Sequence, residues 1–288
     1  MNRSKIIGAT ALATVMTAGA AQAEMSIGGF VEGYLNDGGN GMSQAFGTNS
    51  LYVTYSDSLD NGMGVSAAMS IYSTNILTAV SIDTGMGTVS LGNNRDSAVD
   101  KNDSNPACFS LGACGGAELG AFNDGDTVSG NSIGYSNSMG GLNFMITRGM
   151  EGANVDPVMS YAVGTSIMGA SVKAGVSSID YKDSTQDIDP SFITASYSIA
   201  GLDLGYGMYD NDDGNEETTM GVGTSMAGFD MGIQFASLDA GTDKDMTEIS
   251  VNKSMGAMSF GVDYTDTDVA GTETGDSENW RFYYIIGF

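Results

Sequence analysis

The sequence predicts an all-β protein, a transmembrane antiparallel β-barrel of 16 strands. Three observations predict this fold. Apolar and polar residues alternate with period two along most of the chain, tight glycine-bearing turns recur between the alternating segments, and the last segment is apolar at every second position. Each part of the chain supports this prediction in turn.

The first 23 residues are predicted to be a secretory signal peptide. Arg3 and Lys5 precede an apolar run of small residues, 6–18, which leads into Ala21-Gln22-Ala23. A charged segment, a short apolar segment and a small-residue cleavage motif are typical of an exported protein. A membrane anchor is the alternative, but the run is short for one. We therefore expect residues 24–288 to form the exported barrel.

The composition excludes several classes of function. Without Arg3 and Lys5 the chain has 8 basic and 35 acidic residues, a net charge of −27, which leaves no basic surface for nucleic acid. Hydrophobic residues make up 41% of the chain, too many for a disordered acidic protein. Histidine is absent, which removes His-dependent catalysis and His-ligated zinc. We therefore expect a folded protein that is not an enzyme.

Four segments show the strand pattern most clearly, namely residues 170–177, 202–209, 229–236 and 258–265. In the second of these, Leu204 and Tyr206 alternate with Gly205 and Gly207. Successive side chains of a strand point to opposite faces, so each segment has one apolar face and one polar or very small face. Such strands fit a wall with lipid on one side and water on the other.

Two kinds of connection alternate between the strands. Seven are tight and mostly glycine-bearing, at residues 60–63, 84–87, 138–141, 166–169, 198–201, 225–228 and 254–257. Eight lie at the opposite ends and are mostly longer and more acidic, at residues 36–48, 73–75, 93–128, 149–156, 182–190, 210–217, 239–245 and 266–277. Fifteen connections join 16 strands, and a barrel of that size leaves an aqueous channel.

The C-terminal segment completes the predicted barrel. Trp280, Phe282, Tyr284, Ile286 and Phe288 share one parity, while Arg281 leads the other. An exposed strand edge of this kind would aggregate in water. We therefore expect the last strand to pair with the first and to turn its apolar face to lipid.

Together, the leader, the alternating series and the terminal aromatic strand resemble the alphaproteobacterial general diffusion porins. The resemblance spans residues 24–288 and implies a trimeric 16-stranded barrel in the outer membrane of a Gram-negative bacterium, surrounded by outer-membrane lipid. It also implies an assembly signal at the C-terminus, matched here by Phe282, Tyr284, Ile286 and Phe288.

Residues 93–128 form the longest segment without alternation, and a segment of this length is unusual unless it is functional. It follows the fifth predicted strand, and the resemblance implies that it folds inward and narrows the pore. A loop folded outward is the alternative. The predicted constriction carries the charged residues Arg95, Asp96, Asp100, Lys101, Asp103, Glu118, Asp124 and Asp126.

The charges of the pore wall are predicted from strand parity. The inward-facing candidates are Lys173, Asp203, Asp230, Glu248, Asp263 and Arg281, whereas Arg148 and Lys253 take the outward parity. The resemblance implies basic residues opposite the acidic loop, and this wall has few. Acidic rings favour cations, so we expect a cation-preferring pore.

Two further features concern covalent and metal chemistry. Cys108 and Cys114 are the only cysteines, and in an exported protein they are expected to form a disulfide. Asp210, Asp212 and Asp213 lie in a loop rich in the oxygen ligands of calcium, although its spacing does not match a helix-flanked calcium loop. A solvated acidic loop is the simpler interpretation, and no other cofactor is expected.

The predicted function is an outer-membrane porin, a water-filled channel for passive diffusion of small hydrophilic solutes and ions. The alternative is a surface or adhesion barrel whose acidic loops bind a partner or divalent cations. An enzyme on a barrel scaffold is disfavoured by the missing histidine. The path of residues 93–128 separates the first two, because an inward loop makes a channel and an outward loop a binding surface.

Overall fold

The structure is a computed structural model that describes residues 24–37, 42–47, 49–72, 75–93, 98–99, 105–108, 131–150, 156–180, 182, 187–212, 214–271 and 277–288. The predicted signal peptide, residues 1–23, lies outside these ranges and stays a prediction. Within the described ranges there is no helix long and apolar enough to cross a membrane.

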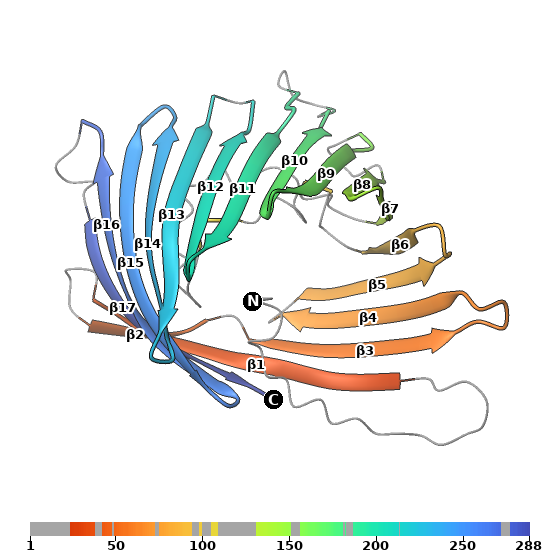
Figure 1. Ribbon diagram of the computed structural model, residues 1–288, viewed down its shortest axis with the longest axis horizontal. Helices are drawn as coiled ribbons and strands as arrows, with labels where there is room; N and C mark the ends of the chain where they lie inside the picture. The colour runs from red at the N-terminus through yellow and green to blue at the C-terminus, as the bar shows by residue number, and fades with distance from the viewer. Residues whose placement is uncertain are drawn as a thin grey trace.

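One antiparallel sheet contains every described strand. The strands are β1 (Glu24–Asp37), β2 (Met42–Phe46), β3 (Ser50–Ser58), β4 (Gly64–Tyr72), β5 (Asn75–Asp83), β6 (Thr88–Asn93), β7 (Ser132–Met139), β8 (Leu142–Gly149), β9 (Met159–Ile167), β10 (Ala170–Ser178), β11 (Ser191–Ile199), β12 (Leu202–Asp210), β13 (Glu216–Met226), β14 (Phe229–Asp239), β15 (Lys244–Met255), β16 (Met258–Val269) and β17 (Ser277–Gly287). From β3 onward each strand pairs with its sequence neighbours (Figure 1).

The sheet closes on itself through its first and last strands. β1 pairs with β17 from Phe30↔Gly287 to Asp37↔Trp280, and the red-orange β1 lies beside the blue β17 in Figure 1. The first half of β1 also pairs with β3 and its second half with β2. β2, which ends at Phe46, and β3, which begins at Ser50, are therefore two parts of one wall strand. The wall thus has 16 strands, which confirms the predicted antiparallel barrel.

The tight turns have the backbone geometry that antiparallel neighbours require. Four of them place two consecutive residues at positive φ, the second always glycine, as at Gly140 (62°) and Gly141 (84°) and at Met168 (51°) and Gly169 (88°). The Ala200–Gly201 and Ala227–Gly228 turns repeat the pattern. Two consecutive positive φ angles define the turn whose twist matches that of paired strands. The recurrent Gly therefore fixes where each strand reverses.

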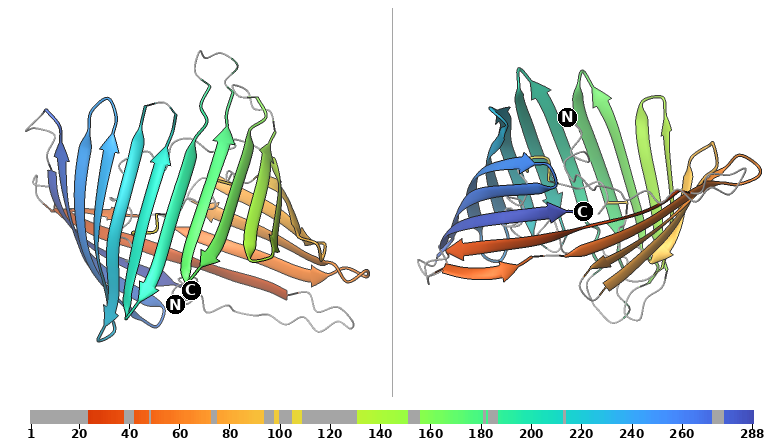
Figure 2. Two further views of the ribbon diagram at one scale, coloured as in Figure 1. Left: turned by 45° about the horizontal axis from the view of Figure 1, so that its top comes forward. Right: turned by 90° about the horizontal axis from the view of Figure 1, so that it is seen from below.

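The two faces of the wall differ as the alternation predicts. Large apolar side chains such as Tyr161, Tyr206 and Val222 are exposed on one parity, the face that meets lipid. The opposite parity carries small or polar residues such as Ser160 and Thr219, both fully shielded. These two faces are visible as the outside and inside of the curved wall in Figure 2.

The first strand has an unclear alternation in sequence because large apolar or aromatic residues occupy both of its faces. Met25, Ile27 and Val31 are exposed on the outer face. Phe30 and Tyr34 take the inner parity, where Tyr34 pairs with Tyr283 of β17. The join between the two ends of the chain is therefore lined by aromatic rings on the lumen side.

The C-terminal residues follow the predicted parity. Trp280, Phe282 and Ile286 are exposed on the outer face, while Tyr283 is buried on the inner face. Phe288 exchanges both backbone hydrogen bonds with Gly29, each 3.0 Å long. The carboxyl-terminal residue is thus paired into the wall. The assembly role of Phe282, Tyr284, Ile286 and Phe288 stays a prediction.

Candidate functional site: the barrel lumen

The lumen face of β8 to β11 is lined by short hydroxyl side chains. Thr147, Ser160, Ser177 and Thr194 all lie on the inner parity and are shielded. Ser177 Oγ donates to Ser160 Oγ at 2.9 Å. Short side chains leave space inside a wide barrel, whereas a packed interior would need large apolar ones.

A charged cluster occupies the lumen face of β15 to β17. Arg281 donates from Nε to Asp263 Oδ2 at 2.9 Å, and its Nη2 lies 2.8 Å from the same oxygen. Glu248 lies on β15 within electrostatic reach of both, repelled by Asp263 and attracted by Arg281. Three of the six predicted wall charges, Glu248, Asp263 and Arg281, are therefore brought together at mid-height of the wall.

The other three predicted wall charges lie apart from this cluster. Lys173 of β10 has Gly164 and Thr194 as its cross-strand neighbours, on a distant part of the wall. Asp203 and Asp230 lie beside tight turns, where they accept hydrogen bonds from Ser198 and Ser225. These two carboxylates therefore belong to the turn end of the barrel and not to its middle.

Two described parts of the segment between β6 and β7 contact the lumen face. The first is Ala98–Val99, where the Val99 amide donates to Ser160 Oγ at 3.0 Å. Both residues are buried in a small apolar cluster with Ala162, Phe192, Tyr209 and Leu238 of the wall. This contact joins the segment to β9, β11, β12 and β14.

The second part, Asn105–Ala107, lies against glycines of β12 and β13. A Cβ at Gly205 would fall 2.0 Å from Pro106 O, and one at Gly221 would fall 2.7 Å from Ala107 O. Thr219 Oγ1 donates to Asn105 Oδ1 at 3.2 Å. Because glycine has no side chain, the backbone of the segment can approach the wall closely at these positions.

The geometry is that of a closed wall with a polar lumen, and sequence comparison identifies its family. A family model described as Gram-negative porin matches residues 8–287. This chain belongs to the Gram-negative porin family. It is accordingly a protein of the outer membrane of a Gram-negative bacterium, as predicted. No curated protein matches the sequence significantly.

Solved structures of outer-membrane proteins share the fold. In-vitro folded OmpT of Vibrio cholerae, in its trimer form, is 13% identical with a TM-score of 0.71, covering 92% of this chain and 99% of its own. A triple mutant of Rhodopseudomonas blastica porin is 16% identical with a TM-score of 0.69, covering 92% and 100%. At such low identity these similarities concern the fold alone.

Most of the predicted constriction of this porin lies outside the described residues. That is so for Arg95, Asp96, Asp100, Lys101, Asp103, Glu118, Asp124 and Asp126. The contacts of residues 98–99 and 105–107 place only those two parts against the lumen face. The inward fold of the whole segment therefore stays a prediction.

The predicted disulfide falls partly on the described residues. The amide of Cys108 donates to Asn105 O at 3.4 Å, and the described part of the porin contains no free cysteine. Cys114 lies outside that part. The bond between Cys108 and Cys114 therefore stays a prediction.

The predicted calcium loop is also only partly described. Asp210 Oδ1 accepts from the amide of Asp212 at 2.8 Å, so this carboxylate closes a turn of its own loop. Asp213 lies outside the described ranges. Among the residues that are described, no group of three His, Cys, Asp or Glu side chains is arranged to hold a metal ion. The calcium prediction stays untested.

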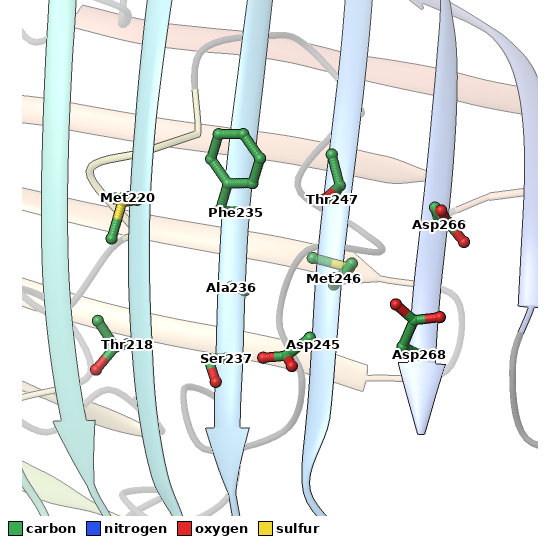
Figure 3. Close-up of a pocket in the computed structure, with 10 residues that line it drawn as sticks. All are labelled: Thr218, Met220, Phe235, Ala236, Ser237, Asp245, Met246, Thr247, Asp266 and Asp268. Atoms are coloured by element: carbon green, nitrogen blue, oxygen red, sulfur yellow. The ribbon is translucent and has the colours of Figure 1, made fainter. Parts of the chain in front are cut away.

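The outer face of the same wall has a cavity of about 270 Å³ near the loop ends of β13 to β16 (Figure 3). Its lining changes from Met220 and Phe235 to the acidic Asp245, Asp266 and Asp268. Figure 3 shows Asp245 and Asp268 side by side on neighbouring strands, where they are register partners. The change from apolar to acidic marks the upper edge of the lipid-facing belt.

Reasoning from sequence missed the glycine contacts of the 93–128 segment. Gly175, Gly205 and Gly221 all take the inner parity, and each lies against Val99, Pro106 or Ala107. A Gly is unremarkable in a strand that already alternates with Gly and Ser. The available signal was glycine at inward-facing positions of several nearby strands. These glycines can be recognised as one group only when the strand register is known.

Proposed function

We propose that this porin is a water-filled channel for passive diffusion of small hydrophilic solutes and ions, with no catalysis and no resident cofactor. The observation that carries the proposal is the lumen face, which is built of short hydroxyl side chains and glycine in a closed wall of 16 strands. Such a barrel retains water in its centre.

A preference for cations is part of the proposal. The chain from residue 24 onward has a net charge of −27, and the charged cluster of the wall has two carboxylates against one guanidinium. An excess of fixed negative charge attracts cations and lowers the local concentration of anions. The charged residues of the 93–128 segment would add further negative charge if that segment folds inward.

The proposed constriction is the 93–128 segment, held to the wall at Val99 and at Asn105–Ala107. A Cys108–Cys114 disulfide would close a very small loop, and on the entropic model this stabilises by roughly 2–3 kcal/mol at best. Its larger effect would be to stiffen the segment directly after its contact with Gly221. The bore of the channel would then stay constant.

We also propose a homotrimer in which each barrel keeps its own pore. The support is the shared fold with a solved trimer form of OmpT of Vibrio cholerae. The closer kinship with alphaproteobacterial porins rests on the terminal aromatic strand, which ends in Phe288, and on the alternating series.

The test is single-channel recording on the protein purified from outer membranes, in a planar bilayer under a KCl gradient. We expect large ohmic steps and a reversal potential on the cation side. A Glu248→Gln, Asp263→Asn double variant should move the reversal potential toward zero. Glu216→Gln, which removes an exposed carboxylate of the outer parity, should leave it unchanged.

Two results would contradict the proposal. A folded barrel that gives no current steps is not a diffusion channel. The surface-barrel alternative, in which the acidic loops bind a partner or divalent cations, would then be favoured. An anion-sided reversal potential would leave the channel in place but refute its cation preference.

A further inference from the structure

Four oxygen-bearing side chains are neighbours on the lumen face of β15 and β16. Glu248, Ser250 and Asn252 are successive inner-parity residues of β15, and Asp263 of β16 is the register partner of Ser250. Asp263 therefore has Glu248 and Asn252 as its two diagonal neighbours, with Cβ atoms roughly 7–8 Å apart. At that separation the side chains can converge on one point between the strands.

These polar atoms are shielded and most have no hydrogen-bond partner. Glu248 is 2% exposed, Asn252 2% and Asp263 1%. Both carboxylate oxygens of Glu248, the amide oxygen and nitrogen of Asn252, and Asp263 Oδ1 are without a partner. A shielded carboxylate without a partner is strongly destabilising, so this group is expected to take up a compensating cation.

Arg281 compensates the negative charge of this group only in part. Its Nε and Nη2 both contact Oδ2 of Asp263, at 2.9 and 2.8 Å, while Oδ1 of Asp263 has no hydrogen-bond partner. Glu248 and Asp263 repel each other electrostatically. Two carboxylates against one guanidinium leave one negative charge, together with oxygen atoms from Glu248, Asp263 and Asn252.

We propose that Glu248, Asn252 and Asp263 form a weak binding site for a hard divalent cation of the Ca²⁺ class within the lumen of the porin. Carboxylate and carboxamide oxygens are the ligands that Ca²⁺ takes, and its flexible geometry tolerates an irregular set completed by water. Mg²⁺ demands stricter octahedral geometry and keeps its own waters, so it should bind less well. Among the described residues only two acidic side chains, Glu248 and Asp263, contribute here, and no group of three acidic, His or Cys ligands is present. Because few charged ligands give weak binding, we expect a Kd of about 1 mM.

The site lies at the level where the 93–128 segment meets the wall. Gly221, which faces Ala107 O, pairs with Gln234, and Gln234 pairs with Glu248. Glu248 is therefore two strands from that contact, about 10 Å along the sheet. A bound divalent ion at this level would reduce the passage of monovalent cations, and its weak affinity would let it leave.

The binding test uses the protein purified in detergent from outer membranes, dialysed to equilibrium against ⁴⁵Ca²⁺ in constant KCl. We expect the wild type to bind one Ca²⁺ per chain more than Glu248→Gln, with a midpoint near the Kd of about 1 mM. Glu216→Gln, which removes an exposed carboxylate elsewhere, should bind as the wild type does. Equal Ca²⁺ uptake by the wild type and Glu248→Gln would overturn the site.

The Arg281→Gln variant distinguishes a Ca²⁺ site from a loss of Ca²⁺ uptake that is caused by disruption of the wall. Removing the guanidinium leaves Asp263 free to bind the ion with both oxygens, so the affinity for Ca²⁺ should rise by about tenfold. A mere lesion of the wall would lower uptake in Arg281→Gln as in Glu248→Gln. Loss of uptake in both, or equal competition by Mg²⁺ and Ca²⁺, would refute the assignment.

Of these tests, only the measurement of channel current depends on the proposed function. With KCl on both sides, millimolar CaCl₂ should reduce the single-channel K⁺ current of the wild type and not that of Glu248→Gln. Absence of channels in KCl alone would refute the channel, while the dialysis result would still decide the site. Channels that respond to Ca²⁺ equally in both proteins would leave the channel in place and overturn the site.

Discussion

Two stretches of the lumen wall of this porin differ in what their inward-facing positions carry. On β10, β12 and β13 the inner positions Gly175, Gly205 and Gly221 carry no side chain, and a segment of the chain lies directly on the backbone. On β15 to β17 the corresponding positions carry the shielded Glu248 and Asp263 and the half-buried Arg281. The first stretch contacts the described parts of the segment between β6 and β7, and the second carries charged side chains on the lumen face.

The comparison teaches that the stability of the two stretches has different sources. Contact with the segment depends on close approach, because the Cβ position of Gly205 is only 2.0 Å from Pro106 O. The charged stretch depends on one ion pair between Arg281 and Asp263 and is otherwise under-compensated. Substitutions in the two stretches should therefore differ in how much stability they remove and in which second substitution restores it.

The largest expected effect is at the ion pair. Arg281→Gln removes the donor of Asp263, which is 1% exposed, and removing one partner of a buried pair lowers the free energy of unfolding by about 3–5 kcal/mol. Urea unfolding from lipid vesicles, followed by fluorescence of the single Trp, would measure the loss. The measurement should be made with a Ca²⁺ chelator present.

A second variant tests whether the loss comes from the unpaired carboxylate. Adding Asp263→Asn to Arg281→Gln removes the charge that was left behind, so most of the stability should return. A double variant as unstable as Arg281→Gln alone would mean that the guanidinium acts by packing and not by pairing.

The next effect is at the glycine stretch. Gly205→Val places a side chain where Pro106 O lies, so the 105–107 contact must be displaced. Overpacking of this kind lowers stability by about 1–3 kcal/mol. Because the segment leaves the wall, single-channel conductance should also change, whereas Arg281→Gln should alter selectivity.

Gly164→Val is the matched control for this substitution. Gly164 also lies on the lumen face, but its Cβ position meets the flexible Lys173 side chain at 3.3 Å, which can move aside. Its stability and conductance should stay close to those of the wild type. If Gly164→Val changed conductance as much as Gly205→Val, added bulk in the lumen would explain both, and the contact with Pro106 would be unimportant.

Much of the fold could be predicted because alternation and turns are local properties of the sequence. Leu204 and Tyr206 against Gly205 and Gly207 fix which face of β12 meets lipid, and the Gly of each tight turn fixes where the chain reverses. The division of the second strand into β2 and β3 could not be predicted in this way. It arises because β1 pairs with β3 in its first half and with β2 in its second, a tertiary relation.

The site was predictable in its parity but not in its grouping. Parity assigned Glu248, Asp263 and Arg281 to the inner face, and it assigned Lys173, Asp203 and Asp230 to the same face without distinguishing them. Only the register makes Asp263 the partner of Arg281 and sets Asp203 and Asp230 beside turns. A one-residue change of register would separate these charges, so grouping requires the paired structure.

The smallest expected effect lies on the outer face, where neither kind of lumen stretch is involved. Lys253 Nζ lies 4.5 Å from the centroid of the Phe229 ring, between β15 and β14 near their turn ends. Lys253→Met keeps the apolar stem and removes this cation–π contact, so stability should fall by only about 0.5–1 kcal/mol. In a Phe229→Leu background the same change should have no effect, because the ring is already gone. A loss that persists there would assign the role of Lys253 to the membrane interface, and conductance should be unchanged in either case because this face lies outside the lumen.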